Sequence, residues 1–203
     1  PPRWAFGNYA SRFGYRSEKE VRDVVRRFRR EKIPLDAVIL DIFWFGPDVT
    51  GHMGNHDWDR NAFPDAEDMI GDFARDGVRT IPITEPFILT TSTNWQDAVD
   101  SDAIARDVTG DARRFDFFFG NTGLVDVFNE AGKQWFWQFY ERLFEQGVAG
   151  TWGDLGEPEV HPADSLHFVE AAGRQATADE IHNAYGHVWA QLVYENQVRR
   201  YPN

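Results

Sequence analysis

Three acidic residues stand at the ends of predicted β-strands, where their side chains could act on a substrate. Asp154 follows the short, Gly-bounded apolar run 147–152, and Asp41 and Glu85 end two earlier apolar runs. The carboxyl ends of barrel strands converge on one rim, so acids at several strand ends meet despite their distance in sequence. A carboxylate in such a place can act as a nucleophile or as an acid or base. The pattern predicts Asp154 as a nucleophile within a rim of three carboxylates.

Each of these acids also has a structural interpretation. Asp41 could cap a backbone turn, and Glu85, which precedes a proline, could be a solvated loop residue. The acidic junction around Asp154 could cap a helix or bind solvent cations. The structural and catalytic interpretations predict different burial and different hydrogen-bond partners for these acids, so a structure can distinguish them.

Three further polar residues follow Asp154 in the same loop. Glu157 could orient Asp154 or a neighbouring residue through a hydrogen bond instead of contacting a substrate. Glu159 and His161 could line the same rim or serve the fold. The sequence contains no Gly-x-Ser-x-Gly segment, so Ser-His-Asp chemistry has no local signature.

One loop gathers residues that metals bind. It holds His52, His56, Asp57 and Asp59, and a His-x-x-x-His spacing places two imidazoles together on a helix. Neighbouring glycines argue against a helix here. The sequence therefore favours a polar rim loop, and we expect no metal and no cofactor.

The elements that must position these residues alternate between strand and helix. Predicted strands cover residues 4–6, 37–42, 79–83 and 147–152. Predicted helices with apolar stripes of period 3.6 begin at the capping box Ser17/Glu20, at Asp65, at Asn129 and at a second capping box, Thr177/Glu180. This order predicts a parallel sheet with crossover helices. Pro82 is awkward within the third strand, because a central strand needs every backbone N–H.

The length of the chain limits how much of a barrel it can form. The sequence has 203 residues, whereas a complete (β/α)8 barrel needs about 250. Residues 86–128 form a long excursion after the third strand, which predicts a β-hairpin or lid-like insert with a turn at Gly110 and Asp111. We expect about four strand–helix units, either half a barrel or a segment of a larger protein.

Several collinear segments resemble glycoside hydrolase family 31. The run Trp152-Gly153-Asp154-Leu155-Gly156-Glu157-Pro158 is similar to the family's nucleophile signature, Trp-x-Asp-x-x-Glu-Pro, at the end of the fourth strand of a (β/α)8 barrel. The other similar segments are 4–12 with Tyr15, 33–44, 84–87 and 117–123. The last two resemble a branch that includes bacterial α-glucosidases and α-transglucosylases.

The resemblance implies a fold, a reaction and a set of site residues. The fold is an α/β parallel barrel of the TIM type, with residues 1–203 forming a single partial-barrel segment of a multidomain protein. The reaction is retaining α-glycoside hydrolysis or transfer, with Asp154 as nucleophile and Glu157 as a supporting acid. The residues implied to bind the sugar are Asp41, Trp44, Glu85 and Trp152.

The resemblance leaves other features open. The family's acid/base is an Asp on a later strand end, and neither Asp164 nor Asp179 stands in a similar segment. We therefore expect the acid/base beyond Asn203 and little turnover by this segment alone. α-Glucosides, α-xylosides and α-galactosides are all possible substrates, and a non-catalytic carbohydrate-binding half-barrel is the alternative from another class.

The composition of the chain limits the classes of partner that it can bind. A net charge of −12 and a pI near 4.9 argue against nucleic acid, because binding phosphates requires clustered Lys and Arg. The sequence has no run of about 18 apolar residues that would predict a membrane span. The absence of cysteine excludes disulfides and thiolate chemistry. We expect an α-linked oligosaccharide or α-glycoside as substrate and the rest of the parent barrel with its flanking domains as partner. No targeting signal indicates a compartment, although the resemblance to bacterial glycosidases favours the periplasm or the exterior.

Overall fold

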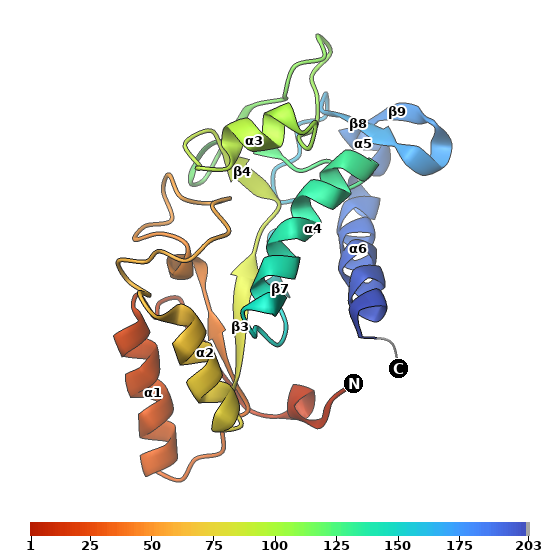
Figure 1. Ribbon diagram of the computed structural model, residues 1–203. Coiled ribbons are helices and arrows are strands. Elements are labelled where there is room, and N and C mark those ends of the chain that lie inside the picture. The colour runs from red at the N-terminus through yellow and green to blue at the C-terminus, as the bar shows by residue number, and fades with distance from the viewer. Residues whose placement is uncertain (202–203) are drawn as a thin grey trace. The chain divides into compact units, whose positions relative to one another are not determined.

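The computed structural model describes residues 1–201, which form two compact units (Figure 1). The first unit comprises Pro1–Val49, His56–Thr84 and Glu141–Trp152, and the second comprises Thr50–Asn55, Glu85–Tyr140 and Gly153–Asn203. No helix within residues 1–201 is both long and apolar enough to cross a membrane.

The first unit is built on the predicted parallel sheet. Its strand order is β1–β2–β3–β7, where the strands span Tyr9–Ala10, Ala37–Leu40, Arg79–Thr84 and Trp152–Gly153. β1 pairs with β2 and β2 with β3 in parallel, with Ala37 opposite Arg79 and Leu40 opposite Pro82. Pro82 is thus accommodated opposite the last residue of β2. The α/β class and the parallel sheet are confirmed.

The prediction of a first strand at residues 4–6 is wrong. Arg3–Phe6 forms a 3-10 turn, η1, in which Ala5 N–H donates to Pro2 O and Gly7 N–H to Trp4 O. None of its residues is buried, so the apolar run contributes nothing to the core. The strand begins three residues later, where Asn8 N–H donates to the Asp36 carboxylate and brings β1 beside β2.

Two helices of the first unit lie side by side (Figure 1). α1 spans Glu18–Arg30 and α2 spans Ala66–Arg75. Ser17 caps α1 by accepting the Glu20 N–H at 3.3 Å, but the Glu20 carboxylate accepts from Arg16 N–H and so only half of the predicted capping box forms. Arg22 joins the two helices, bonding Glu18 and Asp72 at 2.7 Å each.

The second unit contains the predicted insert. β4, Phe87–Leu89, pairs with β6, Gly120–Leu124, which also pairs with β5, Phe115–Phe117; both pairings are antiparallel. The short helix α3, Trp95–Asp100, follows β4. A turn at Asp107–Asp111, with Gly110 at φ +92°, is the one expected from the sequence. The hairpin expected within residues 86–128 is therefore confirmed, extended by β4 to three strands.

The remainder of the chain alternates helices with one hairpin. α4 spans Glu130–Glu145, and its predicted apolar stripe, Phe136 to Phe144, is buried. The segment before the capping box Thr177/Glu180, for which the sequence predicts no strand, holds the antiparallel hairpin of β8, Leu166–Val169, and β9, Arg174–Thr177. The short turn η3, Glu170–Ala172, connects its strands, and α5, Ala178–Ile181, η4, His182–Ala184, and α6, Tyr185–Arg200, follow.

Candidate active site

Asp41 immediately follows β2 and is nearly buried, at 8% exposure. Its Oδ1 accepts the Ile42 N–H at 2.8 Å, at the start of the 3-10 turn η2, Ile42–Trp44. The capping interpretation of Asp41 is thus confirmed for one carboxylate oxygen. Binding of sugar hydroxyls by this residue stays a prediction.

Trp44 ends the same turn in the core of the first unit. It has no exposed surface, its Nε1–H donates to Ile83 O at 3.0 Å, and its N–H donates to Asp41 O at 3.2 Å. Trp58 packs edge-on against it with ring centroids 5.0 Å apart. Neither face of Trp44 is open to a sugar in this arrangement. These contacts hold Trp44 within the turn that carries Asp41, and its part in a sugar pocket stays a prediction.

Glu85 directly follows β3 and is completely buried. The interpretation of Glu85 as a solvated loop residue is therefore wrong, because the chain encloses it before Pro86 begins the insert. A buried carboxylate must be compensated by hydrogen bonds or charge, so this position is structurally demanding. Its contact with substrate remains a prediction.

Trp152 occupies the strand that follows β3 in the sheet. Its carbonyl accepts a hydrogen bond from Thr84 Oγ1 at 3.4 Å, and the preceding segment bonds β3 through Ala149 N–H to Thr80 O at 3.2 Å. The fourth strand is much shorter than the predicted run 147–152, since only Trp152 and Gly153 have strand geometry. The Trp152 side chain is half-buried, so it keeps surface for a ligand.

Asp154 leaves the end of β7 on a tight loop. Asp154, Leu155 and Gly156 are half-buried, and Leu155 adopts φ +58°, a left-handed conformation that is costly for a branched residue. Glu157 is exposed, and within residues 1–201 it makes no hydrogen bond to Asp154. The supporting role of Glu157 therefore stays a prediction.

The second unit contains a hydrogen-bonded chain of one aspartate and three histidines that no sequence motif indicated. Asp126 Oδ1 lies 2.9 Å from His167 Nδ1, His167 Nε2 lies 2.8 Å from His161 Nε2, and His161 Nδ1 lies 3.3 Å from His182 Nδ1. Asp126 and His167 are buried, at 2% and 0% exposure. His161, which the sequence placed on the rim or in a structural role, is the central link.

Asp126 determines the direction of the first hydrogen bond in this group of side chains. A carboxylate only accepts, so His167 donates from Nδ1 to Asp126, and when the His167 ring carries only that proton its Nε2 accepts from His161. His161 then accepts at Nδ1 from His182. Burial, followed by the proximity of His167 and His182, lowers the pKa of His161 to about 3, which keeps its imidazole neutral. One set of neutral tautomers thus satisfies every contact.

The loop with the other histidines does not form a ligand cluster. His56 is buried, while His52 bonds Thr50 O at 3.1 Å through Nδ1. Among residues 1–201, no three His, Asp or Glu side chains are arranged to hold a metal ion.

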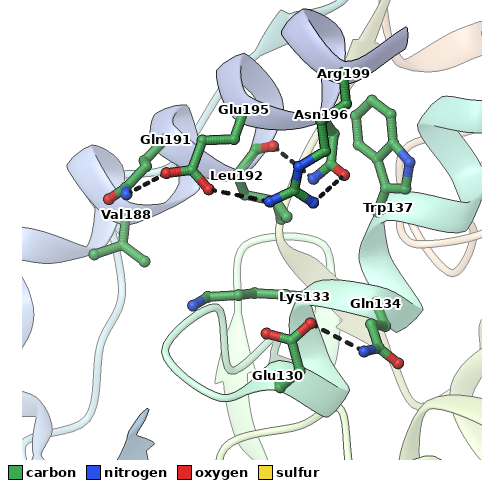
Figure 2. Close-up of a pocket in the computed structure, with 10 residues that line it drawn as sticks. All are labelled: Glu130, Lys133, Gln134, Trp137, Val188, Gln191, Leu192, Glu195, Asn196 and Arg199. Atoms are coloured by element: carbon green, nitrogen blue, oxygen red, sulfur yellow. Dashed lines mark hydrogen bonds and ion pairs between the residues drawn. The ribbon is translucent and has the colours of Figure 1, made fainter. Parts of the chain in front are cut away.

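A cavity of about 260 Å³ is lined by residues of α4 and α6, and none of the predicted site residues is among them (Figure 2). Its polar side chains bond one another: Gln134 to Glu130 at 2.9 Å, Gln191 to Glu195 at 2.6 Å, and Arg199 to Asn196 at 3.4 Å. These pairs satisfy most of the polar groups that a ligand would have to engage. The cavity is therefore a weaker candidate than the strand ends.

The strand order makes the ends of β2, β3 and β7 consecutive in the sheet, and Asp41, Glu85 and Asp154 follow these ends in the chain. The profile described as "Glycosyl hydrolases family 31 TIM-barrel domain" matches residues 1–203. The chain belongs to glycosyl hydrolase family 31. The resemblance noted in the sequence and the partial TIM-barrel fold are both confirmed.

Individual members of the family are similar over almost the whole chain. "Alpha-glucosidase 2" of Bacillus thermoamyloliquefaciens is 28% identical over 96% of this chain and 25% of its own length. The α-xylosidase of Lactiplantibacillus pentosus is 27% identical over 96% of this chain and 25% of its own. A family 31 dextranase of Flavobacterium johnsoniae, solved with glucose, superimposes with a TM-score of 0.87 at 28% identity, over 100% of this chain and 25% of that one. The chain thus spans about a quarter of these relatives.

Proposed function

We propose that residues 1–203 form the first half of the catalytic barrel of a retaining α-glycosidase or α-transglucosylase. The observation that carries this proposal is the placement of Asp154 directly after β7, within a Trp-x-Asp-x-x-Glu-Pro run, in a chain that matches the family over its full length. Relatives that include an α-glucosidase, α-xylosidases and a dextranase support an α-glycoside as substrate.

In the proposed reaction, an Asp154 carboxylate oxygen attacks the anomeric carbon of the sugar. The bond between that carbon and the leaving oxygen breaks, and the leaving oxygen takes a proton from a second carboxylic acid. Water or an acceptor sugar then resolves the resulting glycosyl ester. Asp41 and Glu85 bind hydroxyls of the reacting sugar, and Trp44 and Trp152 shape its pocket.

The proton donor is proposed to lie beyond Asn203. Asp164 is exposed and pairs with Arg113 at 2.8 Å, and Asp179 stands in the first turn of α5, where it stabilises the helix dipole. Both residues thus have structural explanations. Glu157, exposed and not bonded to Asp154, stays a candidate for a supporting acid that engages only when substrate is bound.

Trapping of the covalent intermediate tests this function. The complete polypeptide is incubated with 5-fluoro-α-glucosyl fluoride, whose fluoride leaves with little help from an acid, and the labelled peptide is mapped by mass spectrometry. We expect the label on Asp154. Asp154→Asn should abolish labelling, whereas Asp164→Asn, the same change at an exposed ion pair, should leave it intact.

The sugar class is tested in the same experiment. Galacto- and xylo-configured fluorides replace the gluco reagent, and the fastest labelling identifies the preferred sugar; an α-xylosidase or α-galactosidase of the family would prefer its own reagent. Failure of all three reagents to label the folded polypeptide would refute the retaining mechanism and favour a non-catalytic carbohydrate-binding barrel.

A further inference from the structure

The loop that carries Asp154 rests directly on the indole ring of Trp189. A Cβ atom added to Gly156 would lie 2.4 Å from both Cε3 and Cζ3 of Trp189, and one added to Gly153 would lie 3.2 Å from Cη2. The six-membered ring therefore contacts the backbone on both sides of Asp154. Only glycine at position 156 allows this approach.

The first turn of α6 supports the same loop at a second point. A Cβ atom on Gly186 would lie 2.8 Å from the Gly156 carbonyl oxygen. Gly186 and Trp189 are three residues apart and so share a helix face. Glycine within a helix costs about 1 kcal/mol relative to alanine, and close approach to the Asp154 loop provides a physical reason for it here.

Trp189 is itself held in place. It is 5% exposed, its Nε1–H donates to the Tyr140 hydroxyl at 2.9 Å, and its ring stacks on Phe136 with centroids 5.7 Å apart. Tyr140 and Phe136 are fully buried on α4. The surface beneath the loop is thus a fixed aromatic platform.

We infer that Gly186 and Trp189 are positioning residues for Asp154. They act through the backbone of residues 153–156 and set where the carboxylate stands relative to the anomeric carbon. The inference rests on the proposed function of Asp154. Its kinetic importance follows from the steep dependence of rate on geometry, since a 1 Å displacement of a reacting group can cost about 100-fold.

Gly186→Ala in the complete polypeptide is the primary test. The new methyl group must move from 2.8 Å to an ordinary contact distance from the Gly156 oxygen, which displaces the loop by roughly half an ångström and should lower kcat about 10-fold. The rate of covalent labelling at saturating reagent should fall equally, with little change in KM. The matched control is Gly71→Ala in α2, where a Cβ meets only Arg75 Nη1 at 3.6 Å.

A double-mutant comparison keeps the inference testable if Gly186→Ala folds poorly. Gly156→Ala should slow labelling because its methyl group meets the Trp189 ring. Trp189→Leu removes the ring atoms in contact, so Gly156→Ala should have a smaller effect in that background than in the wild type. In a Trp137→Leu background, where the replaced ring stacks on Tyr140 from α4, Gly156→Ala should keep its full effect.

The outcomes separate this inference from the function on which it rests. No labelling of the wild-type protein would refute the nucleophile assignment. Labelling of the wild type at Asp154, with unchanged rates in Gly186→Ala and purely additive effects of Gly156→Ala and Trp189→Leu, would overturn the positioning role and leave the nucleophile intact.

Discussion

Replacement of Asp126 by Asn should open the second unit locally, in a pattern that the hydrogen bonds specify. Asp126 Oδ1 accepts from Phe128 N–H at 3.1 Å and His167 at 2.9 Å, and Oδ2 accepts from Phe168 N–H at 2.9 Å and Asn129 Nδ2 at 3.0 Å. An asparagine keeps one acceptor oxygen and places an NH2 group against the other pair of donors. One backbone N–H must lose its partner in either orientation.

The neighbours decide which orientation costs less. With NH2 at the Oδ1 position, His167 can change tautomer and accept from it, although the change must propagate to His161. With NH2 at the Oδ2 position, Asn129 would have to rotate its amide and give up the bond that its Oδ1 accepts from Gly132 N–H at the start of α4. We therefore expect the first orientation, in which the buried Phe128 N–H is left without an acceptor.

The magnitude follows from burial of that group. A buried donor left unsatisfied costs about 1–3 kcal/mol, which corresponds to roughly 5- to 150-fold faster hydrogen exchange through local opening. Peptide-resolved hydrogen–deuterium exchange on the complete polypeptide measures this directly. In Asp126→Asn, the Phe128 amide should lose this protection, while the Phe168 amide should change much less.

Asp164→Asn provides the matched control. Asp164 is exposed and, among residues 1–201, pairs only with Arg113, an interaction worth about 0–1 kcal/mol. Hydrogen exchange around Phe128 in the Asp164→Asn variant should match that of the wild type. Equal protection of Phe128 in Asp126→Asn and the wild type, or greater loss at Phe168, would refute the hydrogen-bond reasoning.

Two further predictions concern the same unit. Stability should fall as the pH drops below about 6.5, because the folded pKa of His161, about 3, lies below its unfolded value and the unfolded chain takes up a proton first. Thermal unfolding midpoints between pH 7 and 5 should therefore depend less on pH in His161→Gln than in the wild type or in His187→Gln, an exposed control; parallel curves for all three would exclude this role. Tyr185→Phe removes a buried hydroxyl that donates to Val125 O at 2.7 Å, and should destabilise the protein by about 1–2 kcal/mol. Tyr194→Phe, at 68% exposure, should stay within about 0.5 kcal/mol in the same melts, and equal effects would contradict the prediction.

The helices were predictable because their signals are local. Ser17 caps α1, Asn129 caps α4 through Gly132 N–H, and Glu180 bonds the Thr177 N–H at the start of α5, each within a few residues. Apolar stripes of period 3.6 then fixed the buried faces of α1 and α4. β2 and β3 were predictable for a similar reason, since each is an apolar run between turn signals.

The wrong predictions arose where the apolar pattern of the sequence disagrees with the actual pairing of strands. Trp4–Phe6 is apolar yet forms a 3-10 turn, because the neighbour that a strand needs is reached only at Tyr9. The β8–β9 hairpin was missed because its turn at Gly173 connects strands with weak alternation, Leu166–Val169 and Arg174–Thr177. Pairing between distant or weakly patterned segments is a tertiary property, and composition records it poorly.

The candidate functional residues show the same difference between local signals and contacts of distant residues. The positions of Asp41, Glu85 and Asp154 could be predicted, since each follows an apolar run at a strand end. The hydrogen-bonded group of Asp126, His161, His167 and His182 could not, because its contacts join residues that are 6, 21 and 41 positions apart. No spacing rule connects these residues, and each alone is an ordinary polar residue in a loop, strand or turn.

Glycine at two positions nevertheless left a trace of the tertiary arrangement in the sequence. Gly186 lies in the first turn of a 16-residue helix, where most residues would favour the helix more, and Gly156 lies beside a left-handed Leu155 that would itself suit glycine better. Local preference is thus violated at two sites that touch each other, with a Cβ on Gly186 reaching to 2.8 Å of the Gly156 oxygen. Local preference is given up where a specific tertiary contact or a functional geometry requires it. Because the two violations converge on the backbone that holds Asp154, they support the proposal that this contact positions its carboxylate.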